Sequence, residues 1–272
     1  MKQRNEIPAY HLYQTLRYTY YQSSKPAGCP ILFISGLFAG DWIWEAILPP
    51  LRENDVSLIV LREPLASLGP TVDILCSYLK CILDDLNIYR AILVGNSYGG
   101  LLALEIAARY PERVQSIVVS GSPGLGSAVS LGRDALGVSR VVNREFAMHI
   151  ASQLFYDHSL ISEEMLSRTL ATFSSSSIIL NMLRLLKAEK KYDVRAILPR
   201  IQCETLLLWG QNDAVTPLSA WEQNQSLLKK ASLKVIADCG HTAMIEKAAQ
   251  FYALMWSFLT STESIVSHEE SA

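Results

Sequence analysis

Short apolar runs alternate with amphipathic stretches along most of this chain. The apolar runs lie at residues 11–21, 30–35, 57–61, 90–95, 116–121, 205–210 and 233–237. The central runs are continuously apolar, as expected of strands buried on both faces of a sheet. Because such runs alternate with helical patterns, the sequence predicts an α/β domain with a mostly parallel sheet.

Amphipathic helices are predicted between these strands. Apolar side chains recur at helical spacing over residues 72–86, and Thr71 is a suitable N-cap. A similar pattern predicts a last helix over 243–259, followed by a disordered tail at 261–272. Asp41 is expected to cap a short helix over 42–48, which Pro49 and Pro50 cut short or kink.

One segment, residues 123–199, breaks the alternation and is called the insertion below. It has helical patterns, clearest over 162–173 and 177–191, and no convincing strand. Its position between two strands predicts a helical cap over one end of the sheet rather than a separate domain. Residues 1–122 and 200–260 then form the α/β core, and the glycine- and serine-rich residues 121–132 are expected to act as a mobile hinge.

The composition narrows the classes of function. The chain has 272 residues, of which 50% are hydrophobic, and a formal net charge of -2 without an extended block of like charge. This disfavours a nucleic-acid or membrane-surface role based on charge. No apolar run is long enough to span a bilayer, and the N-terminus lacks a signal-peptide core. Five cysteines form neither a CxxC pair nor a Cys/His cluster, so we expect reduced thiols, no metal or cofactor, and a cytoplasmic location.

The candidate chemistry begins at residues 95–99, GNSYG, which fit the pattern G-x-S-x-G. An apolar run precedes Ser97 and a helical pattern follows it, so the serine is expected on a sharp strand-to-helix turn with its hydroxyl above the sheet. Glycine is expected at 95 and 99 because side chains there would clash. The alternative is a glycine-rich turn with an idle serine.

A serine hydroxyl needs a base, and the base needs a group that orients it. On a fold of this kind the chain order is serine, acid, histidine. Asp213 follows the run at 205–210, and His241 follows the run at 233–237. Asp238 is the rival acid, but it lies too near His241 along the chain to orient it. Ser97, Asp213 and His241 are therefore the predicted catalytic residues.

The negative charge that develops on a carbonyl oxygen during acyl transfer requires N–H donors already in place. One predicted donor is the backbone N–H of Tyr98, directly after the serine. The second is expected in the turn after the run at 30–35, where Leu37 is the first choice and Phe38 the second.

With strand-GNSYGG-helix, WGQND and CGHTAMIE in this order, the chain resembles the α/β-hydrolase fold superfamily over nearly its whole length. GNSYGGLLALEIAARYPERV, FYDHSLISEEML and GHTAMIEKAAQF resemble the branch of meta-cleavage-product hydrolases and carboxylesterases. The resemblance implies a triad of Ser97, Asp213 and His241 and a cap formed by the insertion. Ser35-Gly36 stands where the branch usually has His-Gly, Thr242 stands where its carbon–carbon hydrolases have Trp, and the D-x-P-G-x-G-x-S turn is missing.

These features together predict a serine carboxylesterase or thioesterase that forms a covalent acyl-enzyme. The expected substrate is a small to medium apolar acyl or aryl ester, free or bound to a carrier protein. Because of the departures, carbon–carbon hydrolysis of a dienoate is kept as an alternative, as is a carrier-protein methyl esterase. A non-catalytic ligand-binding protein is the alternative from another class, and the oligomeric state is left open.

Overall fold

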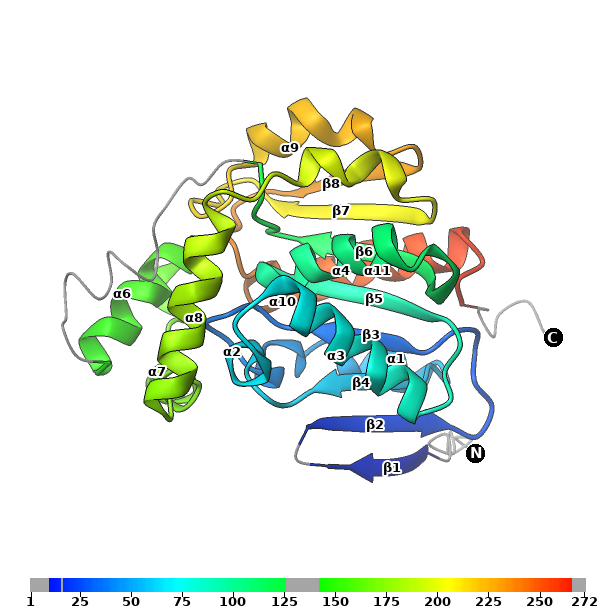
Figure 1. Ribbon diagram of the computed structural model, residues 1–272, viewed down its shortest axis with the longest axis horizontal. Coiled ribbons are helices and arrows are strands. Elements are labelled where there is room, and N and C mark those ends of the chain that lie inside the picture. Colours follow the sequence, from blue (N-terminus) through cyan, green and yellow to red (C-terminus); the bar gives the residue numbers. More distant parts are fainter. Residues whose placement is uncertain (1–9, 16, 126–141, 266–272) are drawn as a thin grey trace, which may run out of the picture.

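The computed structural model describes residues 10–15, 17–125 and 142–265 (Figure 1). At its centre is an eight-stranded sheet in the order β1-β2-β4-β3-β5-β6-β7-β8, with β1 and β2 antiparallel and the neighbouring pairs from β4 to β8 parallel. The strands are Tyr10–Gln14, Tyr18–Ser23, Ile31–Ile34, Leu58–Leu61, Ala91–Asn96, Val114–Ser120, Glu204–Gly210 and Ala231–Ile236. The predicted mostly parallel sheet is confirmed.

The apolar run at 11–21 forms two strands, β1 and β2, instead of the single strand expected from its sequence. The Thr15 hydroxyl accepts hydrogen bonds from the N–H groups of Arg17 and Tyr18 and donates to the Tyr18 carbonyl. Local bonds of this kind stabilise a tight turn, and the chain reverses direction there.

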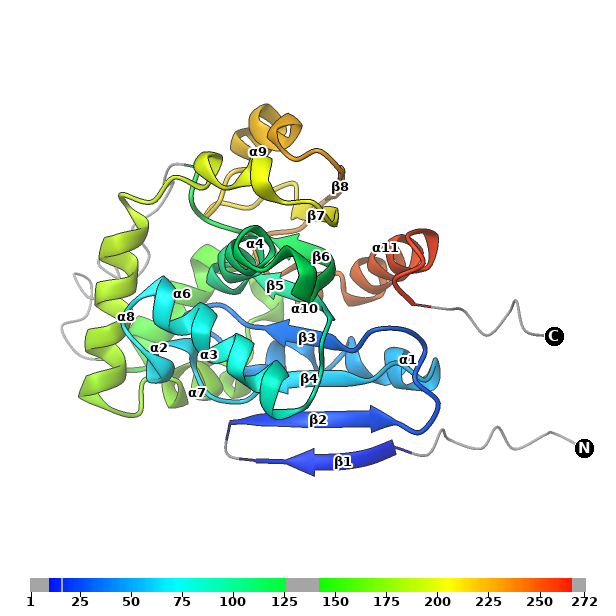
Figure 2. The same ribbon diagram turned by 45° about the vertical axis from the view of Figure 1, so that its right-hand side comes forward.

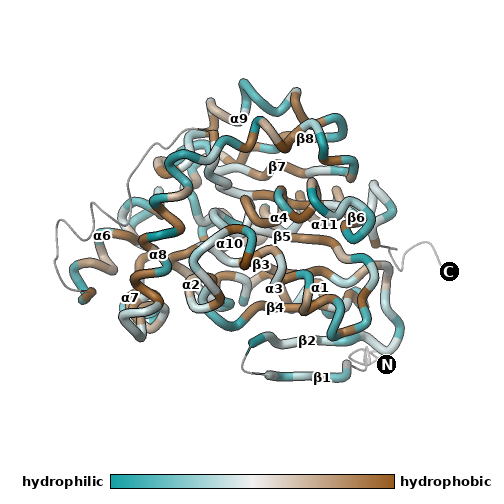
Figure 3. Tube along the Cα trace, viewed as in Figure 1, coloured by the Kyte–Doolittle hydropathy of each residue, from teal (hydrophilic) through white to brown (hydrophobic). Residues whose placement is uncertain are grey.

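Helices cover both faces of the sheet. On one face lie α2 (Leu65–Leu68), α3 (Val72–Asp85), α4 (Tyr98–Arg109) and α9 (Leu218–Asn224). On the other lie the 3-10 helix η1 (Asp41–Trp44), α1 (Leu48–Glu53), α10 (Ala243–Glu246) and α11 (Ala248–Ser261). The strands β3, β4 and β5 are buried along their whole length, and Figure 3 shows this hydrophobic centre. The layering explains why the sequence patterns of these strands are continuously apolar.

The prediction for residues 71–86 is confirmed, since Thr71 caps α3 by accepting the Ile74 N–H at 3.3 Å. The prediction for 42–48 is wrong. Gly40, not Asp41, is the N-cap of a 3-10 helix, and Pro49 and Pro50 lie in the first turn of α1. Proline is tolerated there because the first N–H groups of a helix have no partner within it.

The last predicted helix is divided at Lys247, whose φ of -133° and ψ of 47° separate α10 from α11. Ser264 and Ile265, expected to be part of a disordered tail, are buried against the core. Ser264 donates to the Ser116 hydroxyl at 2.9 Å, and Ile265 is buried. The tail prediction is therefore wrong at Ser264 and Ile265, and its remainder, 266–272, lies outside the described residues.

In the described part of the insertion, helices lie beyond the carboxyl ends of the parallel strands (Figures 1 and 2). They are α6 (Arg144–Leu154), α7 (Glu163–Ala171) and α8 (Ser176–Glu189), with 3-10 turns at His158–Leu160, Val194–Ala196 and Leu198–Arg200. Phe173 joins the insertion to the core, because its ring lies 6.0 Å from that of Phe38 and 5.4 Å from that of Phe146. Most of the predicted hinge, residues 126–132, lies outside the described residues.

A helix that spans a membrane must be both long and apolar. Among the residues that the structure describes, no single helix meets both requirements. Helices α7 and α8 meet them only when taken together, and the pair is bent by 92°.

Candidate active site

Ser97 lies on the turn between β5 and α4, with a φ of 56° and a ψ of -126°. A positive φ in a residue other than glycine is strained by about 1–3 kcal/mol and persists only where the surroundings enforce it. A Cβ on Gly95 would lie 2.3 Å from the Gly99 carbonyl oxygen, and one on Gly99 would lie 2.1 Å from the Ile34 carbonyl oxygen. Both contacts are with backbone, so only glycine permits this turn.

Asp213 and His241 meet at the ends of β7 and β8. The His241 Nδ1 lies 2.8 Å from the Asp213 Oδ2, and both side chains are buried. The Asp213 Oδ1 accepts the N–H groups of Val215 at 2.9 Å and Thr216 at 2.8 Å, while Oδ2 also accepts the Thr216 hydroxyl at 2.8 Å. The sequence-predicted acid and base are thus in direct contact.

Burial alone would raise the pKa of Asp213. The charge of His241 and hydrogen bonds from His241 and Thr216 act in the opposite direction and hold the pKa below its ordinary value. The carboxylate is therefore ionised and can only accept hydrogen bonds, which makes Nδ1 of His241 the donor. In the neutral imidazole the lone pair then lies on Nε2, the position required of a general base.

Nε2 of His241 is buried and has no hydrogen-bond partner within the described part of the chain. The structure therefore joins Asp213 to His241 but shows no hydrogen bond from Ser97 to His241. Catalytic hydrogen bonds are often long in the absence of substrate and shorten when it binds.

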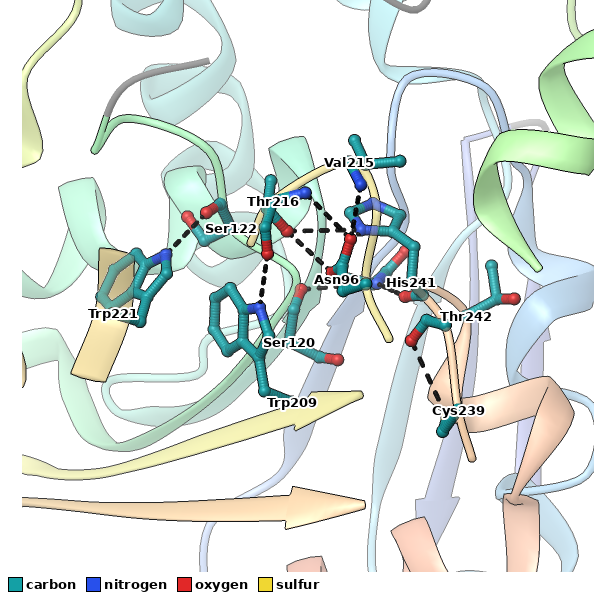
Figure 4. A network of polar contacts seen from close by, with 12 residues as sticks. Asn96, Ser120, Ser122, Trp209, Val215, Thr216, Trp221, Cys239, His241 and Thr242 are labelled. Atoms are coloured by element: carbon teal, nitrogen blue, oxygen red, sulfur yellow. Dashed lines mark hydrogen bonds and ion pairs between the residues drawn. The ribbon is translucent and has the colours of Figure 1, made fainter. Parts of the chain in front are cut away.

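The backbone of His241 is held from two sides. Its N–H donates to the Leu154 carbonyl of the insertion at 2.8 Å, and its carbonyl accepts the Asn96 amide at 3.1 Å. The Asn96 amide also donates to the Ser120 carbonyl at 3.3 Å, which links the serine turn, β6 and the histidine loop (Figure 4). A Cβ on Gly121 would lie 2.6 Å from the His241 Cε1, so glycine there leaves room for the ring.

The loop that contains Leu37 and Phe38 lies against Ser97. A Cβ on Gly36 would be 2.9 Å from the Ser97 Cβ and 3.4 Å from its Oγ. Ser35, which stands where the resembling branch has histidine, donates to the Gly40 carbonyl at 2.8 Å and accepts the Trp44 indole N–H at 3.0 Å. Ser35 thus closes this loop through its own hydrogen bonds.

Sequence reasoning missed Asn96 and Thr216. Asn96 precedes the serine, and Thr216 lies three residues after Asp213, a spacing that allows a side chain and an N–H group to meet one carboxylate. No group of three or more His, Cys, Asp or Glu residues with a metal-binding arrangement occurs in the residues that the structure describes. A strained serine turn, linked through Asn96 to a buried histidine–carboxylate pair, is an arrangement that can support nucleophilic catalysis.

Residues 30–248 match the family model described as the alpha/beta hydrolase fold. The chain belongs to the α/β hydrolase fold family. It is 29% identical to 2-hydroxymuconate semialdehyde hydrolase of Pseudomonas sp. (strain CF600), over 88% of this chain and 89% of that protein. It is 31% identical to a 2-hydroxy-6-oxo-6-phenylhexa-2,4-dienoate hydrolase of Burkholderia cepacia, over 67% of each chain.

The solved structure of a meta-cleavage product hydrolase from Pseudomonas fluorescens is similar with a TM-score of 0.76 and 23% identity, over 90% of this chain and 96% of that one. This likeness concerns the fold. The family match and the hydrolases among the relatives establish that this α/β hydrolase is an enzyme of the hydrolase class.

Proposed function

We propose that this hydrolase cleaves a carbon–carbon bond of a meta-cleavage-type dienoate, with Ser97 as nucleophile, His241 as base and Asp213 as the acid that orients it. The observation that carries the serine mechanism is the buried Asp213–His241 pair, whose 2.8 Å contact leaves Nε2 as the basic nitrogen. The substrate class is supported by the relatives, two of which are hydrolases of dienoates or a closely related semialdehyde. The proposed substrate is therefore a dienoate instead of the ester that was expected from the sequence.

In this mechanism His241 takes the proton of Ser97 as its Oγ bonds to the ketone carbon of the substrate. The backbone N–H groups of Tyr98 and Leu37 stabilise the oxyanion. The substrate reacts in its keto form, in which the proton of its 2-hydroxyl group has moved to the chain carbon beside the ketone. The bond between the ketone carbon and that chain carbon then breaks, the electron pair delocalises through the remaining carbon–carbon double bond onto the 2-keto oxygen, and the proton held by His241 passes to this dienolate leaving group. Water, deprotonated by His241, hydrolyses the acyl-enzyme and releases the carboxylic acid. The insertion forms the cap over this site.

An ester is the second candidate substrate, and one residue favours it. Thr242 stands where the carbon–carbon hydrolases carry a tryptophan after the catalytic histidine. Ester cleavage uses the same attack and the same acyl-enzyme, but an alkoxide or phenoxide leaves instead of a carbanion. The leaving group therefore distinguishes the two reactions.

The test is hydrolysis of 2-hydroxy-6-oxo-6-phenylhexa-2,4-dienoate, followed by loss of the absorbance of its conjugated chain, beside a p-nitrophenyl ester series from acetate to long acyl chains. A kcat/KM for the dienoate well above that for every ester supports the proposal. A kcat/KM for one of the esters well above that for the dienoate would instead identify the protein as an esterase.

The nucleophile is tested by Ser97→Ala in the same assays. Removing the nucleophile of a serine triad lowers kcat by about 10⁶-fold, so turnover should vanish, as should labelling by a fluorophosphonate. A folded Ser97→Ala protein that keeps wild-type turnover would exclude Ser97 as the nucleophile.

A further inference from the structure

Glu246 of α10 joins the loop of His241 to the insertion through both oxygens of its carboxylate. Oε1 accepts the Gly240 N–H at 2.9 Å and the Thr242 hydroxyl at 3.3 Å. Oε2 accepts the N–H groups of Tyr156 at 2.9 Å and Asp157 at 3.1 Å. One side chain therefore holds the residues on both sides of His241 and, at the same time, the segment that follows α6.

The backbones of these two segments are in close contact. The His241 N–H donates to the Leu154 carbonyl at 2.8 Å. A Cβ on Gly240 would lie 2.6 Å from the Tyr156 nitrogen and 2.8 Å from the Leu154 oxygen. Since glycine is needed for this approach, the position of the histidine loop is tied to the position of residues 154–157.

We propose that Glu246 is a positioning residue, which fixes the backbone of His241 against the insertion and so directs Nε2 toward Ser97. The inference rests on the serine mechanism proposed above. Asp213 at 2.8 Å and the Thr216 hydroxyl at 3.4 Å hold the ring through Nδ1, but contacts at one nitrogen leave the ring free to tilt with its backbone. The contacts of Glu246 and Leu154 remove that freedom, and they depend on the insertion being seated on the core.

A carboxylate suits this role because both of its oxygens accept hydrogen bonds. Glutamine has nearly the same shape but presents an NH₂ group in place of one oxygen. In Glu246→Gln, that NH₂ group would face either the donors at Gly240 and Thr242 or those at Tyr156 and Asp157. The substitution therefore breaks the hydrogen bonds to one of the two segments without creating a cavity.

Glu45 provides a matched control. It pairs with Arg168 of α7 at 2.7 Å, so it also connects the core with the insertion, but none of its described contacts reaches the histidine loop. The Glu45 and Arg168 side chains are 62% and 37% exposed, and pairs of this kind contribute little to stability. Glu45→Gln removes a core–insertion contact of the same chemical type at a different place.

The experiment measures the second-order rate constant for labelling of Ser97 by a fluorophosphonate in the wild type, Glu246→Gln and Glu45→Gln, with the unfolding temperature of each. A small misplacement of a catalytic group can lower a rate about 100-fold, so we expect labelling of Glu246→Gln to be about 10- to 100-fold slower. Glu45→Gln should remain within about twofold of the wild type. With a substrate that the wild type turns over, kcat should fall in Glu246→Gln while KM changes little.

Folded Glu246→Gln that labels at the wild-type rate overturns the inference, as does an equal loss in Glu45→Gln. If Glu246→Gln does not fold, Gly240→Ala decides, because its Cβ would meet the backbone of Leu154 and Tyr156 and, at 2.9 Å, the Glu246 Oε1, and so disturbs the same junction without changing Glu246. Slow labelling of that variant supports the inference and wild-type labelling overturns it. A wild type that is not labelled at all shows instead that the serine mechanism has failed, and the inference with it.

Discussion

At the residue scale, Thr216 makes two separate contributions to the site. Its N–H donates to one oxygen of Asp213 and its hydroxyl to the other, the oxygen that also accepts the His241 ring. Thr216→Val removes only the hydroxyl. A hydrogen bond to a charged group is worth about 1.5–3 kcal/mol, and part of this is lost in the transition state, so we expect kcat to fall about three- to tenfold.

Thr216→Ser is the control for that substitution because it keeps the hydroxyl. Steady-state kinetics of both variants should show serine near the wild type and valine clearly lower. Equal rates for the two would mean that the hydroxyl does not orient the Asp213–His241 pair.

The lowered pKa of Asp213 predicts how its contribution to stability depends on pH. An unfolded aspartate titrates near pH 4, about its ordinary pKa. Above that pH the carboxylate is ionised in both the folded and the unfolded state, and its native contacts contribute fully. As the pH falls below that value the unfolded chain binds the proton first, and the contribution is lost as the pH passes through the lower pKa of the folded state.

Urea unfolding of the wild type and Asp213→Asn, from about pH 7 to about pH 3, measures this effect. The difference in unfolding free energy should be largest above about pH 4 and shrink below it. A difference that grows on acidification would contradict a lowered pKa for Asp213.

At the scale of the elements, the turn from β5 to α4 depends on two glycines for different reasons. A Cβ on Gly99 would meet the Ile34 oxygen at 2.1 Å, and that backbone belongs to the central strand β3. A Cβ on Gly100 would meet side-chain atoms of Val119 at 3.1 Å and Ser122 at 3.2 Å, and the Gly95 carbonyl oxygen at 3.3 Å. These distances are all much longer than the contact at Gly99, so a small adjustment of the neighbours relieves them, whereas the backbone of a central strand would have to move for Gly99.

Gly99→Ala should therefore lower the free energy of unfolding by about 3 kcal/mol or more, the upper end of what overpacking costs. Gly100→Ala should cost much less, because alanine also gains about 1 kcal/mol over glycine in helix propensity. Chemical denaturation of both variants checks the order, and equal losses would contradict this account of the turn.

An element could be predicted from the sequence where the residues that determine it lie close together along the chain. The helix at 72–86 has its cap and its periodicity in one stretch, and it was predicted correctly with Thr71 as the cap. Pro49 and Pro50 are compatible with either the end or the first turn of a helix. The two prolines alone therefore do not show whether a helix ends or begins there. The break at Lys247 lies between α10 and α11, and because no proline or glycine marks it, no local pattern predicts it.

The site follows the same rule. The placement of Ser97 on the turn and the contact of Asp213 with His241 were accessible because each follows a strand in a fixed chain order. The contacts of His241 with Asn96 and Leu154 join residues separated by 145 and 87 positions along the chain. No local pattern marks such pairs, so Asn96 and Glu246 became visible only in three dimensions.

At the scale of the whole molecule, the core and the insertion differ in how many buried contacts stabilise them. Every residue of β5 is buried, whereas α7 buries only Leu166 and Thr169. Arg144–Glu163 and Arg168–Glu45 also connect α7 to its surroundings, but these are exposed ion pairs that contribute about 0–1 kcal/mol each. An element with few buried contacts opens at a lower free energy than the global unfolding.

We therefore expect backbone amides in α7 to exchange with deuterium through local opening, and amides in β5 only when the whole molecule unfolds. Hydrogen exchange followed by mass spectrometry measures both. Amides of α7 as strongly protected as those of β5 would contradict this, and would mean that the insertion moves only with the core. In Glu246→Gln the side chain can accept hydrogen bonds from only one of its two segments. Where its NH₂ group faces Tyr156 and Asp157, their amides should exchange faster while those of β5 stay unchanged. That pattern would connect the opening of the insertion with the position of His241, which a rate measurement alone does not reveal.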